Sequence, residues 1–342
     1  MSDIRECAEN QGAAWDAYVD AHPHGTLFHL MAWRRAVERT FGHRAVYFSA
    51  ERGGVPVGVL PLFVVPTLKG RALVSVPYGV YGGILADDPA TAELLLDAAR
   101  QAAEREKAKY VELRSREASG LDLPATDLYV AFERELPATP EECLAAIPRK
   151  SRASVRNGRS KFGVRSEFTG DFTKLYDLYA ANVRRLGSPT FPFRFLLNLR
   201  EAYGAERLDV MHTLFEDRVV SSVLNFYYKD TVVPYYSGTD ESYFFTQCAN
   251  VMYCDLMEEG VRRGYRRFDF GRSRRDAGPY HFKINMGFEP RTLGYQYVLR
   301  GLKEVPRINP SNPRFELPRR IWSRLPLGVT KVVGPQLLRY IP

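Results

Sequence analysis

The sequence is poor in the residues that build metal centres and disulfide frameworks. Its 342 residues include four cysteines and six histidines. The cysteines form no C-x-x-C pair and the histidines no H-E-x-x-H motif, which excludes a disulfide scaffold and a zinc site of common spacing. Cys248 and Cys254 stand six residues apart on a predicted helix, a spacing that favours buried thiols over shared metal ligands. The expected compartment is therefore the reducing cytoplasm.

Long apolar segments and the common nucleotide loops are also missing. No apolar run reaches the roughly 20 residues of a membrane-spanning helix. Residues 1–11 carry acids and no apolar core, unlike a secretory signal. The patterns G-x-G-x-x-G, G-x-x-x-x-G-K-[ST] and G-x-S-x-G are absent. The sequence thus gives no support for dinucleotide binding, P-loop chemistry or a nucleophile elbow.

Acidic residues are scarce in two segments of a chain whose net charge is +8. Residues 149–165 hold seven basic residues and no acid, and residues 301–342 hold eight basic residues and two acids. Such concentration indicates a polyanionic partner, which would be nucleic acid, a phosphorylated ligand or anionic lipid. A solvated basic helix face is the alternative for either segment.

An internal repeat divides the chain. Each half shows a hairpin pattern, then a helical pattern that leads into a strand: 45–65, 91–107 and 109–116 in the first half, 214–228, 246–264 and 266–274 in the second. Arg-Ser-Arg ends the last strand of both halves. Two copies of one α/β unit explain this arrangement. We expect domains at 1–142 and 143–300, with a proline-rich tail at 301–342.

The second half opens with a clear helix signal. Residues 171–186 place Phe172, Leu175 and Leu178 on one face, and Asp171 is a suitable N-cap. Hairpins beside a helix-linked strand pair predict mixed sheets covered by helices.

Residues 270–290 (FGRSRRDAGPYHFKINMGFEP) have the composition least typical of a purely structural segment, with glycines, basic residues and aromatic residues together. We interpret them as a loop that leaves a strand end, where α/β proteins place ligand sites. Lys283, Arg272 and Arg274 would neutralise charge there, and Tyr280 would line the cleft. Asp269, which immediately precedes this segment, would stand beside the site. A basic surface hairpin is the alternative.

A second candidate loop is residues 74–83 (VSVPYGVYGG). Its glycines allow a ligand to approach the backbone closely, and Tyr78 and Tyr81 would line a cleft. A tight turn explains the same residues without any ligand.

Several separated motifs resemble the FemAB-like family. They are YRRFDF with GRSRRDAGPYHFKINMGFEP, PRKSRASVRNGRSKFGV, AERGGVPVGVLPLF, VSVPYGVYGGILADDP and AKYVELRSR. They look like the branch associated with PEP-CTERM/exosortase exopolysaccharide systems. The resemblance spans roughly residues 10 to 300. It implies an α/β fold of two tandem GNAT (acetyltransferase-like) domains with mixed, mostly antiparallel sheets.

The resemblance also implies an activity, an acyltransferase or aminoacyltransferase that acts on an amine of a peptidoglycan or exopolysaccharide precursor. The donor would be aminoacyl-tRNA or acyl-CoA, with no tightly bound cofactor and no metal. The lysine of the family's "FK" motif falls on Lys283, as the residue that stabilises the developing oxyanion. Trp33-Arg34-Arg35 resembles the family's acceptor-binding segment, through Arg35.

The basic segment resembles the family's domain-joining helix, which would place a polyanion near Lys150, Arg152, Arg156 and Lys161. Two departures stand out. Met286 replaces a tryptophan common among relatives, and the Q/R-x-x-G-x-G/A loop that holds the CoA pyrophosphate is absent from both halves.

Three rival functions remain at this point. They are an acyl-CoA-dependent N-acyltransferase of a sugar or amino-sugar precursor, a non-catalytic scaffold of the polysaccharide machinery, and a general RNA-binding protein. The last is disfavoured because the basic segments lack interleaved aromatic residues that stack bases. Residues 315–342 mix apolar and basic side chains, which favours contact with an anionic membrane surface; packing on the second domain is the alternative. The expected location is cytoplasmic and peripheral at the inner membrane, near a lipid-linked or nucleotide-linked precursor.

Overall fold

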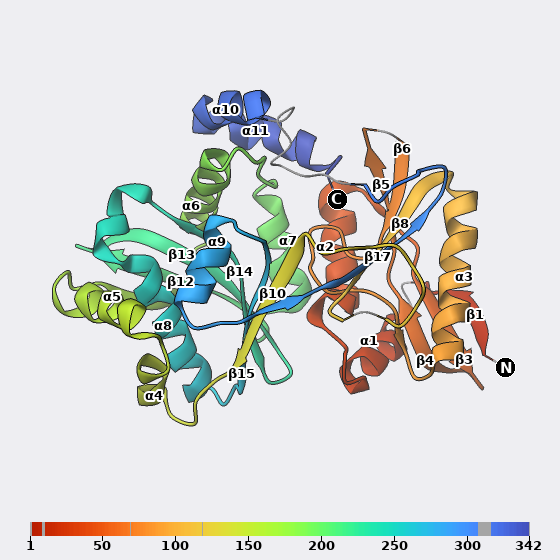
Figure 1. The fold of residues 1–342 in the computed structure, drawn as a ribbon, viewed down its shortest axis with the longest axis horizontal. Helices are drawn as coiled ribbons and strands as arrows, with labels where there is room; N and C mark the ends of the chain where they lie inside the picture. Colours follow the sequence, from red (N-terminus) through yellow and green to blue (C-terminus); the bar gives the residue numbers. More distant parts are fainter. Residues whose placement is uncertain (1, 9–10, 69, 118, 307–315, 342) are drawn as a thin grey trace. The chain divides into compact units, whose positions relative to one another are not determined.

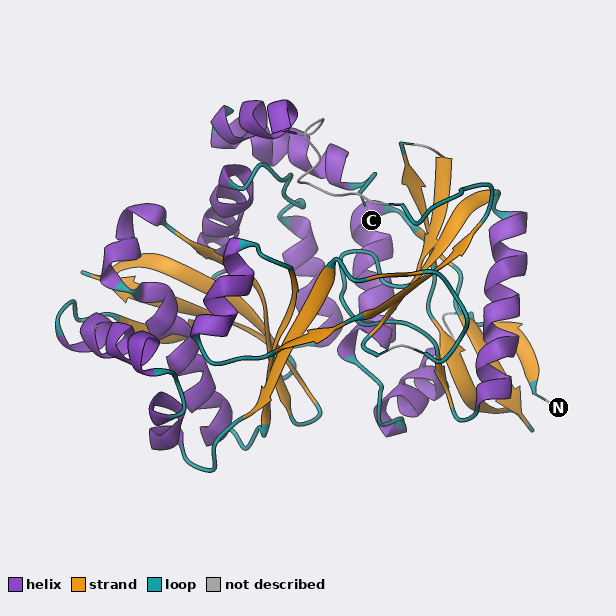
Figure 2. Ribbon diagram, viewed as in Figure 1, coloured by secondary structure: helices purple, strands orange, loops and turns teal. Residues whose placement is uncertain are grey.

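The chain forms two compact units in a computed structural model that describes residues 2–8, 11–68, 70–117, 119–306 and 316–341 (Figure 1). Unit 1 comprises Met1–Leu128, Thr292–Ile308 and Gln336–Pro342. Unit 2 comprises Tyr129–Arg291 and Asn309–Pro335. Each unit combines sheets with covering helices (Figure 2), as the sequence predicts.

Unit 1 contains two sheets, with strand orders β1-β3-β4-β7 and β2-β5-β6-β8-β17-β9. Its strands are β1 (Asp3–Glu6), β2 (Arg44–Ala45), β3 (Phe48–Arg52), β4 (Val55–Leu60), β5 (Phe63–Thr67), β6 (Gly70–Val74), β7 (Leu85–Ala86), β8 (Ala108–Ser115), β9 (Ala125–Thr126) and β17 (Gly294–Leu299). Its helices are α1 (Gly12–Ala21), the short 3-10 helix η2 (Leu27–His29), α2 (Met31–Phe41) and α3 (Pro89–Arg105).

Local sequence explains the main features of unit 1. The β3–β4 hairpin turns at Gly53 and Gly54, whose φ angles of 61° and 81° suit glycine. Helix α3 begins where the side chain of Asp88 accepts a hydrogen bond from the Thr91 amide at 2.7 Å. Its apolar face packs with β3, β4 and β8 to form the core of this unit.

Unit 2 is built on one sheet of order β11-β12-β13-β14-β15-β10-β16. Its strands are β10 (Tyr129–Glu135), β11 (Arg165–Thr169), β12 (Leu208–Phe215), β13 (Arg218–Tyr228), β14 (Thr231–Thr239), β15 (Arg267–Arg274) and β16 (Pro290–Thr292). Its helices are α4 (Pro140–Ala145), α5 (Arg149–Ser160), α6 (Phe172–Arg185), α7 (Arg194–Tyr203), the 3-10 helix η3 (Glu241–Thr246), α8 (Cys248–Arg262), α9 (Gly278–Asn285) and α10 (Glu316–Arg324); α11 (Leu327–Leu338) starts in this unit.

Helices cover both faces of the unit 2 sheet, as alternate residues of β14 demonstrate. Ser237 faces α8, where the Tyr253 hydroxyl donates to its Oγ at 3.0 Å. Tyr236 faces the other way and packs on Tyr179 of α6, with ring centroids 5.5 Å apart. Gly238 lies so close to α6 that a Cβ would meet the Leu178 backbone at 2.3 Å.

Two strands leave the unit that chain order would assign to them. β10 joins the unit 2 sheet through antiparallel pairing with β15. β17 joins unit 1 through antiparallel pairing with β8. The expected division after residues 142 and 300 follows chain order, whereas these units exchange a strand.

The predicted helices and hairpins are present in both halves. Asp171 caps α6 by accepting from the Thr173 amide at 2.7 Å. The β12–β13 turn uses Glu216 and Asp217 with positive φ, which matches the hairpin of the first half. The predicted loop at 270–290 is wrong in one part, because residues 278–285 form helix α9. Pro279 fits there because a proline in the first turn removes only an amide that would lack a helical partner.

Candidate functional site

Lys283 lies in α9 of unit 2 and is buried, with 8% of its surface exposed. Its ammonium donates to the carbonyl oxygens of Phe270 at 2.7 Å, Arg272 at 3.2 Å and Gly271 at 3.3 Å. All three carbonyls belong to β15. The side chain thus fixes the backbone of this strand where it passes Gly271.

The environment of Lys283 changes its ionisation. Burial lowers its pKa to about 7, and the nearby Asp269 carboxylate opposes that change. Asp269 is fully buried, and its Oδ1 accepts from the Gly271 amide at 2.7 Å. Gly271 has φ of 63°, a conformation that glycine adopts without strain. Asp269, Gly271 and Lys283 therefore form one hydrogen-bonded cluster.

This cluster stands where two parallel strands separate. β14 and β15 pair only at Thr231 with Arg267 and at Val232 with Phe268, although both strands continue for several residues. Beyond that point Tyr253 of α8 bonds to Ser237 of β14, and its ring centroid lies 4.7 Å from that of Phe270 of β15. A split between two parallel strands exposes backbone groups that a ligand could bind.

Other predicted residues surround the cluster. Phe132 of β10 lies between Tyr280 and Lys283: its ring is 5.4 Å from the Tyr280 ring and 5.3 Å from the Lys283 Nζ. Arg272 contributes its carbonyl to Lys283, while its guanidinium lies 4.6 Å from the Tyr129 ring centroid. Arg274 is half-buried at the end of β15. No sequence motif pointed to Phe132, because only the pairing of β10 with β15 brings it here.

Helix α8 begins without a capping side chain. Its N-cap residue is Gln247, which has φ of 62° and makes no side-chain cap hydrogen bond. The amides of a first helical turn have no helical acceptor and form the positive end of the helix dipole. Cys248 and Cys254 on this helix are both buried, as predicted. Within the described residues no group of histidine, cysteine or acidic side chains could hold a metal ion.

The predicted polyanion-binding residues lie on and just after α5, which packs on α8. A Cβ at Gly158 would meet Val251 at 2.5 Å, so a glycine is needed for this contact. Lys150, Arg156 and Lys161 are exposed and Arg152 is half-buried. No ion pair joins these four to an acid in the part of the chain that the structure describes. Arg159 differs, since it bonds to Asp255 and Glu258.

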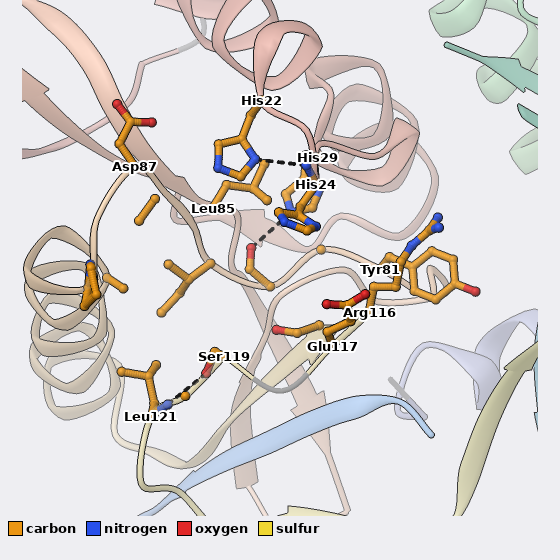
Figure 3. A pocket seen from close by; sticks show the side chains of 18 of the residues that line it. His22, His24, His29, Tyr81, Leu85, Asp87, Arg116, Glu117, Ser119 and Leu121 are labelled. Atoms are coloured by element: carbon orange, nitrogen blue, oxygen red, sulfur yellow. Dashed lines mark hydrogen bonds between the residues drawn. The ribbon is translucent and has the colours of Figure 1, made fainter. Parts of the chain in front are cut away.

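A cavity of about 460 Å³ lies in unit 1 (Figure 3). Its walls come from the segment after α1, the loop before α3, the first turn of α3 and the end of β8; they include His22, His24, Tyr81, Asp87, Asp88, Glu93, Arg116 and Glu117. Tyr81 is held by the Thr26 hydroxyl, which donates to its carbonyl at 2.6 Å, and its ring lies 4.5 Å below the Arg116 guanidinium. Carboxylates outnumber cations on this wall, which suits an amine or hydroxyl ligand better than a phosphate.

Tyr78 and Arg35 also belong to unit 1 but do not line that cavity. Tyr78 stacks on Phe41 with ring centroids 4.1 Å apart, and its hydroxyl bonds to the His43 ring at 2.8 Å. Burial raises the pKa of Tyr78 and lowers that of His43 to about 4. Arg35 is half-buried on α2. The candidate substrate-binding residues are thus divided between the two units.

The basic tail forms the two helices α10 and α11; α10 packs on α6 of unit 2, whereas residues 336–341 belong to unit 1. The Trp322 indole donates to the Ser188 carbonyl at 3.0 Å, and Arg319 donates to the Leu186 carbonyl at 2.9 Å. Leu317, Ile321 and Val332 remain exposed. None of the helices in the described ranges has the length and apolarity to cross a bilayer.

Comparison with known proteins agrees with this geometry. Residues 147–283 match the acetyltransferase (GNAT) domain. That domain spans α5 to Lys283, and it confirms the prediction of an acyltransferase. No curated protein matches the sequence.

Solved structures extend the fold assignment over both units. FemX superimposes with a TM-score of 0.64 at 15% identity, covering 87% of this chain and 97% of its own. A tandem GNAT protein from the clavulanic acid biosynthesis pathway gives 0.56 at 11% identity, covering 89% and 100%. The C-terminal domain of a putative lysylphosphatidylglycerol synthetase from Agrobacterium fabrum gives 0.57 at 13% identity, covering 85% and 92%. The predicted tandem GNAT fold with mostly antiparallel sheets is confirmed.

Proposed function

We propose that the protein transfers an aminoacyl group from aminoacyl-tRNA to an amine of a cell-envelope precursor, of the peptidoglycan or exopolysaccharide type. The observation that carries this proposal is the cationic face of α5, a helix that packs on α8: its exposed basic residues form no ion pair with an acid in the described part of the chain. An RNA carrier supplies the phosphates that such a face would bind. The similarity of the fold to FemX and to a lysylphosphatidylglycerol synthetase domain supports the same reaction class.

The chemistry is an acyl substitution at an ester. The acceptor nitrogen attacks the carbonyl carbon, the carbonyl oxygen takes negative charge, and the ribose oxygen leaves with the ester bond. The amine loses a proton as the amide forms, and the leaving ribose oxygen gains one. Lys283 would supply positive charge beside the developing oxyanion. Because its three N–H bonds already meet carbonyls of β15, it would act by its field and by fixing that strand.

Donor binding by the purified protein tests the proposal. Charged tRNA, uncharged tRNA and a panel of acyl-CoA molecules are compared at low and moderate salt. We expect charged tRNA to bind more tightly than uncharged tRNA, with an affinity that falls steeply as salt rises. Salt-independent binding, or no tRNA binding, would refute the RNA-carried donor.

An acyl-CoA donor is the second candidate, and one observation favours it. The first-turn amides of α8 meet no capping side chain, and such a helix end suits a phosphate group. Specific binding of one acyl-CoA, without tRNA binding, would select this candidate.

Lys283 can be tested separately from the donor. Lys283→Met keeps the length of the side chain and removes its charge. We expect it to lose roughly tenfold to a thousandfold in turnover, the range for groups that stabilise an oxyanion. Lys174→Met, which removes an exposed lysine of α6, is the matched control. Turnover unchanged in Lys283→Met would disprove the assigned role.

The acceptor site belongs to the same proposal. The cavity of unit 1, with Tyr81 on its wall, would bind the amine-bearing precursor, and Arg272, Arg274 and Tyr280 would contact substrate in unit 2. Arg35 and Tyr78 remain predictions as substrate-binding residues. The exposed apolar and basic side chains of α10 and α11 would bring the protein to an anionic membrane that carries a lipid-linked precursor.

A further inference from the structure

A group of aromatic side chains gathers at the C-terminal end of α5 in unit 2. Phe245 lies with its ring centroid 5.6 Å from Phe162 and 6.0 Å from Phe215. Tyr243 lies 5.9 Å from Phe215, and Phe244 is its neighbour in η3. We call these five residues the aromatic surface. They come from three separate segments of the chain, so the sequence alone does not reveal the group.

The inner part of the aromatic surface packs on the protein core, and the outer part is largely exposed. Phe162, Phe215 and Tyr243 pack on a small core of Val164, Val220, Cys248 and Val251. Phe244 and Phe245 are 49% and 55% exposed. Exposed aromatic side chains leave apolar area in contact with water, which is typical of an interaction site.

Cations border the same surface. The Lys161 ammonium lies 5.1 Å from the Phe162 ring centroid, and an Arg218 nitrogen lies 3.5 Å from the Tyr243 hydroxyl. Arg185 lies 5.8 Å from the Phe244 ring but is compensated by Glu241 at 3.6 Å. Arg165 is compensated by Asp217. Lys161 and Arg218 are thus the cations available to a ligand here.

Helix α5 extends this charge away from the aromatic surface. Arg149, Arg152 and Arg156 follow each other at three- and four-residue spacing and share one side of the helix. Lys150 lies on the adjacent row, which leads to Lys161 just past the helix end. The helix has 12 residues, so the basic row is about 18 Å long. It ends at the exposed rings.

We infer that the aromatic surface binds the unpaired bases of a single-stranded RNA end while α5 binds the phosphates that lead to it. Aromatic rings stack on bases of any sequence, and a basic row beside them follows the backbone. A purely apolar partner would leave the row of cations unused. The inference rests on the proposed function, because the RNA that carries an aminoacyl group ends in unpaired nucleotides.

The test uses the full-length protein and a fluorescein-labelled RNA hairpin with a four-nucleotide unpaired 3′ end. The same hairpin with a blunt end is the reference, and anisotropy is measured at several salt concentrations. We expect the overhang to improve affinity at least tenfold, since base stacking on one aromatic residue contributes about 1–3 kcal/mol.

Variants separate stacking from charge. Phe244→Ala with Phe245→Ala is expected to reduce overhang affinity tenfold to a hundredfold and to leave blunt-hairpin affinity and its salt slope unchanged. Phe244→Tyr with Phe245→Tyr should keep the affinity, and Phe244→Leu with Phe245→Leu should lose it. Arg152→Gln with Arg156→Gln should weaken both RNAs and lower the salt slope by about 1.5. Leu197→Ala removes an equally exposed apolar side chain of α7 and is the control.

Each outcome decides one question. Equal affinity for both hairpins, or an unchanged overhang affinity in the alanine double variant, overturns the aromatic surface while α5-dependent RNA binding upholds the proposed function. Absence of binding to either RNA refutes both. If that result comes with a dimer that the alanine double variant abolishes, the surface is a contact between copies of this chain.

Discussion

The sequence Arg-Ser-Arg stands at the end of β8 in unit 1 and of β15 in unit 2, yet the first arginine makes different contacts in each unit. In unit 1 Arg114 is 2% exposed, bonds to Glu112 at 2.7 Å and donates to the carbonyls of Val76 and Gly79. Arg114 therefore anchors to β8 the loop that follows β6. In unit 2 the guanidinium of Arg272 stacks on Tyr129, and Lys283 takes the strand's carbonyls instead. Unit 1 thus holds the loop after β6 with its own arginine, and unit 2 holds one strand of its split with a titratable lysine.

The helices that precede β8 and β15, α3 and α8, also differ in how their N-terminal ends are capped. α3 starts with the Asp88 carboxylate on the Thr91 amide, and Asp87 and Glu93 add negative charge nearby. α8 starts with no capping side chain and packs against cationic α5. The Asp88 carboxylate thus satisfies an amide at the start of α3, whereas no side chain caps the start of α8. The comparison supports the proposal that unit 2 binds the donor and unit 1 the acceptor.

The largest expected effect concerns the ionisation of Lys283. Its pKa is about 7 in the folded chain against an ordinary value of 10.5. Between these values the unfolded chain holds the proton that the folded chain has released, so the free energy of unfolding rises as pH increases from 7 to 10.5. The gain is about 5 kcal/mol at most.

Urea unfolding at pH 6.5, 8 and 9.5 measures this gain by comparison with Lys283→Met, which has no proton to release. The stability of the native chain should rise relative to that of Lys283→Met as pH increases. If the two free energies of unfolding changed equally with pH, the pKa of Lys283 in the folded chain would equal its ordinary value, and the three carbonyls would stabilise the ammonium as well as water does.

The two arginines of the repeat provide the next test. Arg114→Met leaves the Glu112 carboxylate buried without its partner, which is expected to cost about 3–5 kcal/mol. Arg272→Met should cost less, about 1–2 kcal/mol, because Arg272 is half-buried whereas Arg114 is buried. Thermal unfolding of both variants checks the difference. Equal losses would show that unit 2 depends on its arginine as unit 1 does.

Exchanging the helix caps should give the smallest effect. Gln247→Asp places a carboxylate at the start of α8, and we expect donor affinity to fall about twofold to fivefold. Asp88→Asn in unit 1 keeps a capping side chain without its charge and should leave donor affinity unchanged. Affinity measured by anisotropy or calorimetry distinguishes them. Equal responses to both substitutions would remove the assignment of donor binding to unit 2.

The parts of the fold that depend on neighbours in the chain are readable from the sequence. Asp171 caps α6, and paired turn residues close the hairpins of both halves, as predicted. Helix α9 was missed because its eight residues have little amphipathic pattern and begin at Gly278-Pro279. The same holds for the candidate site: the sequence predicts Lys283 as a functional residue, but it does not predict which carbonyl oxygens its ammonium contacts.

The order of residues along the chain does not predict the unit to which β10 and β17 belong. β10 brings Phe132 beside Lys283, and β17 brings Tyr295 to unit 1, where its hydroxyl donates to the Val80 carbonyl at 2.7 Å. Strand pairing depends on registers between residues far apart in the chain, which local patterns do not encode. The aromatic surface was missed for the same reason, since its rings come from segments that no motif connects.

The sequence by itself determined the repeat, the basic segment at 149–165, the absence of metal and disulfide motifs, and Lys283 as the residue to examine. These are properties of composition and local order. Only the tertiary structure decided which of the two equivalent arginines, Arg114 and Arg272, is buried, which helix starts without a capping side chain, and that Lys283 is buried. Those properties depend on burial and on contacts between residues far apart in the chain. Burial matters for Lys283 because it removes water from the ammonium and so lowers its pKa.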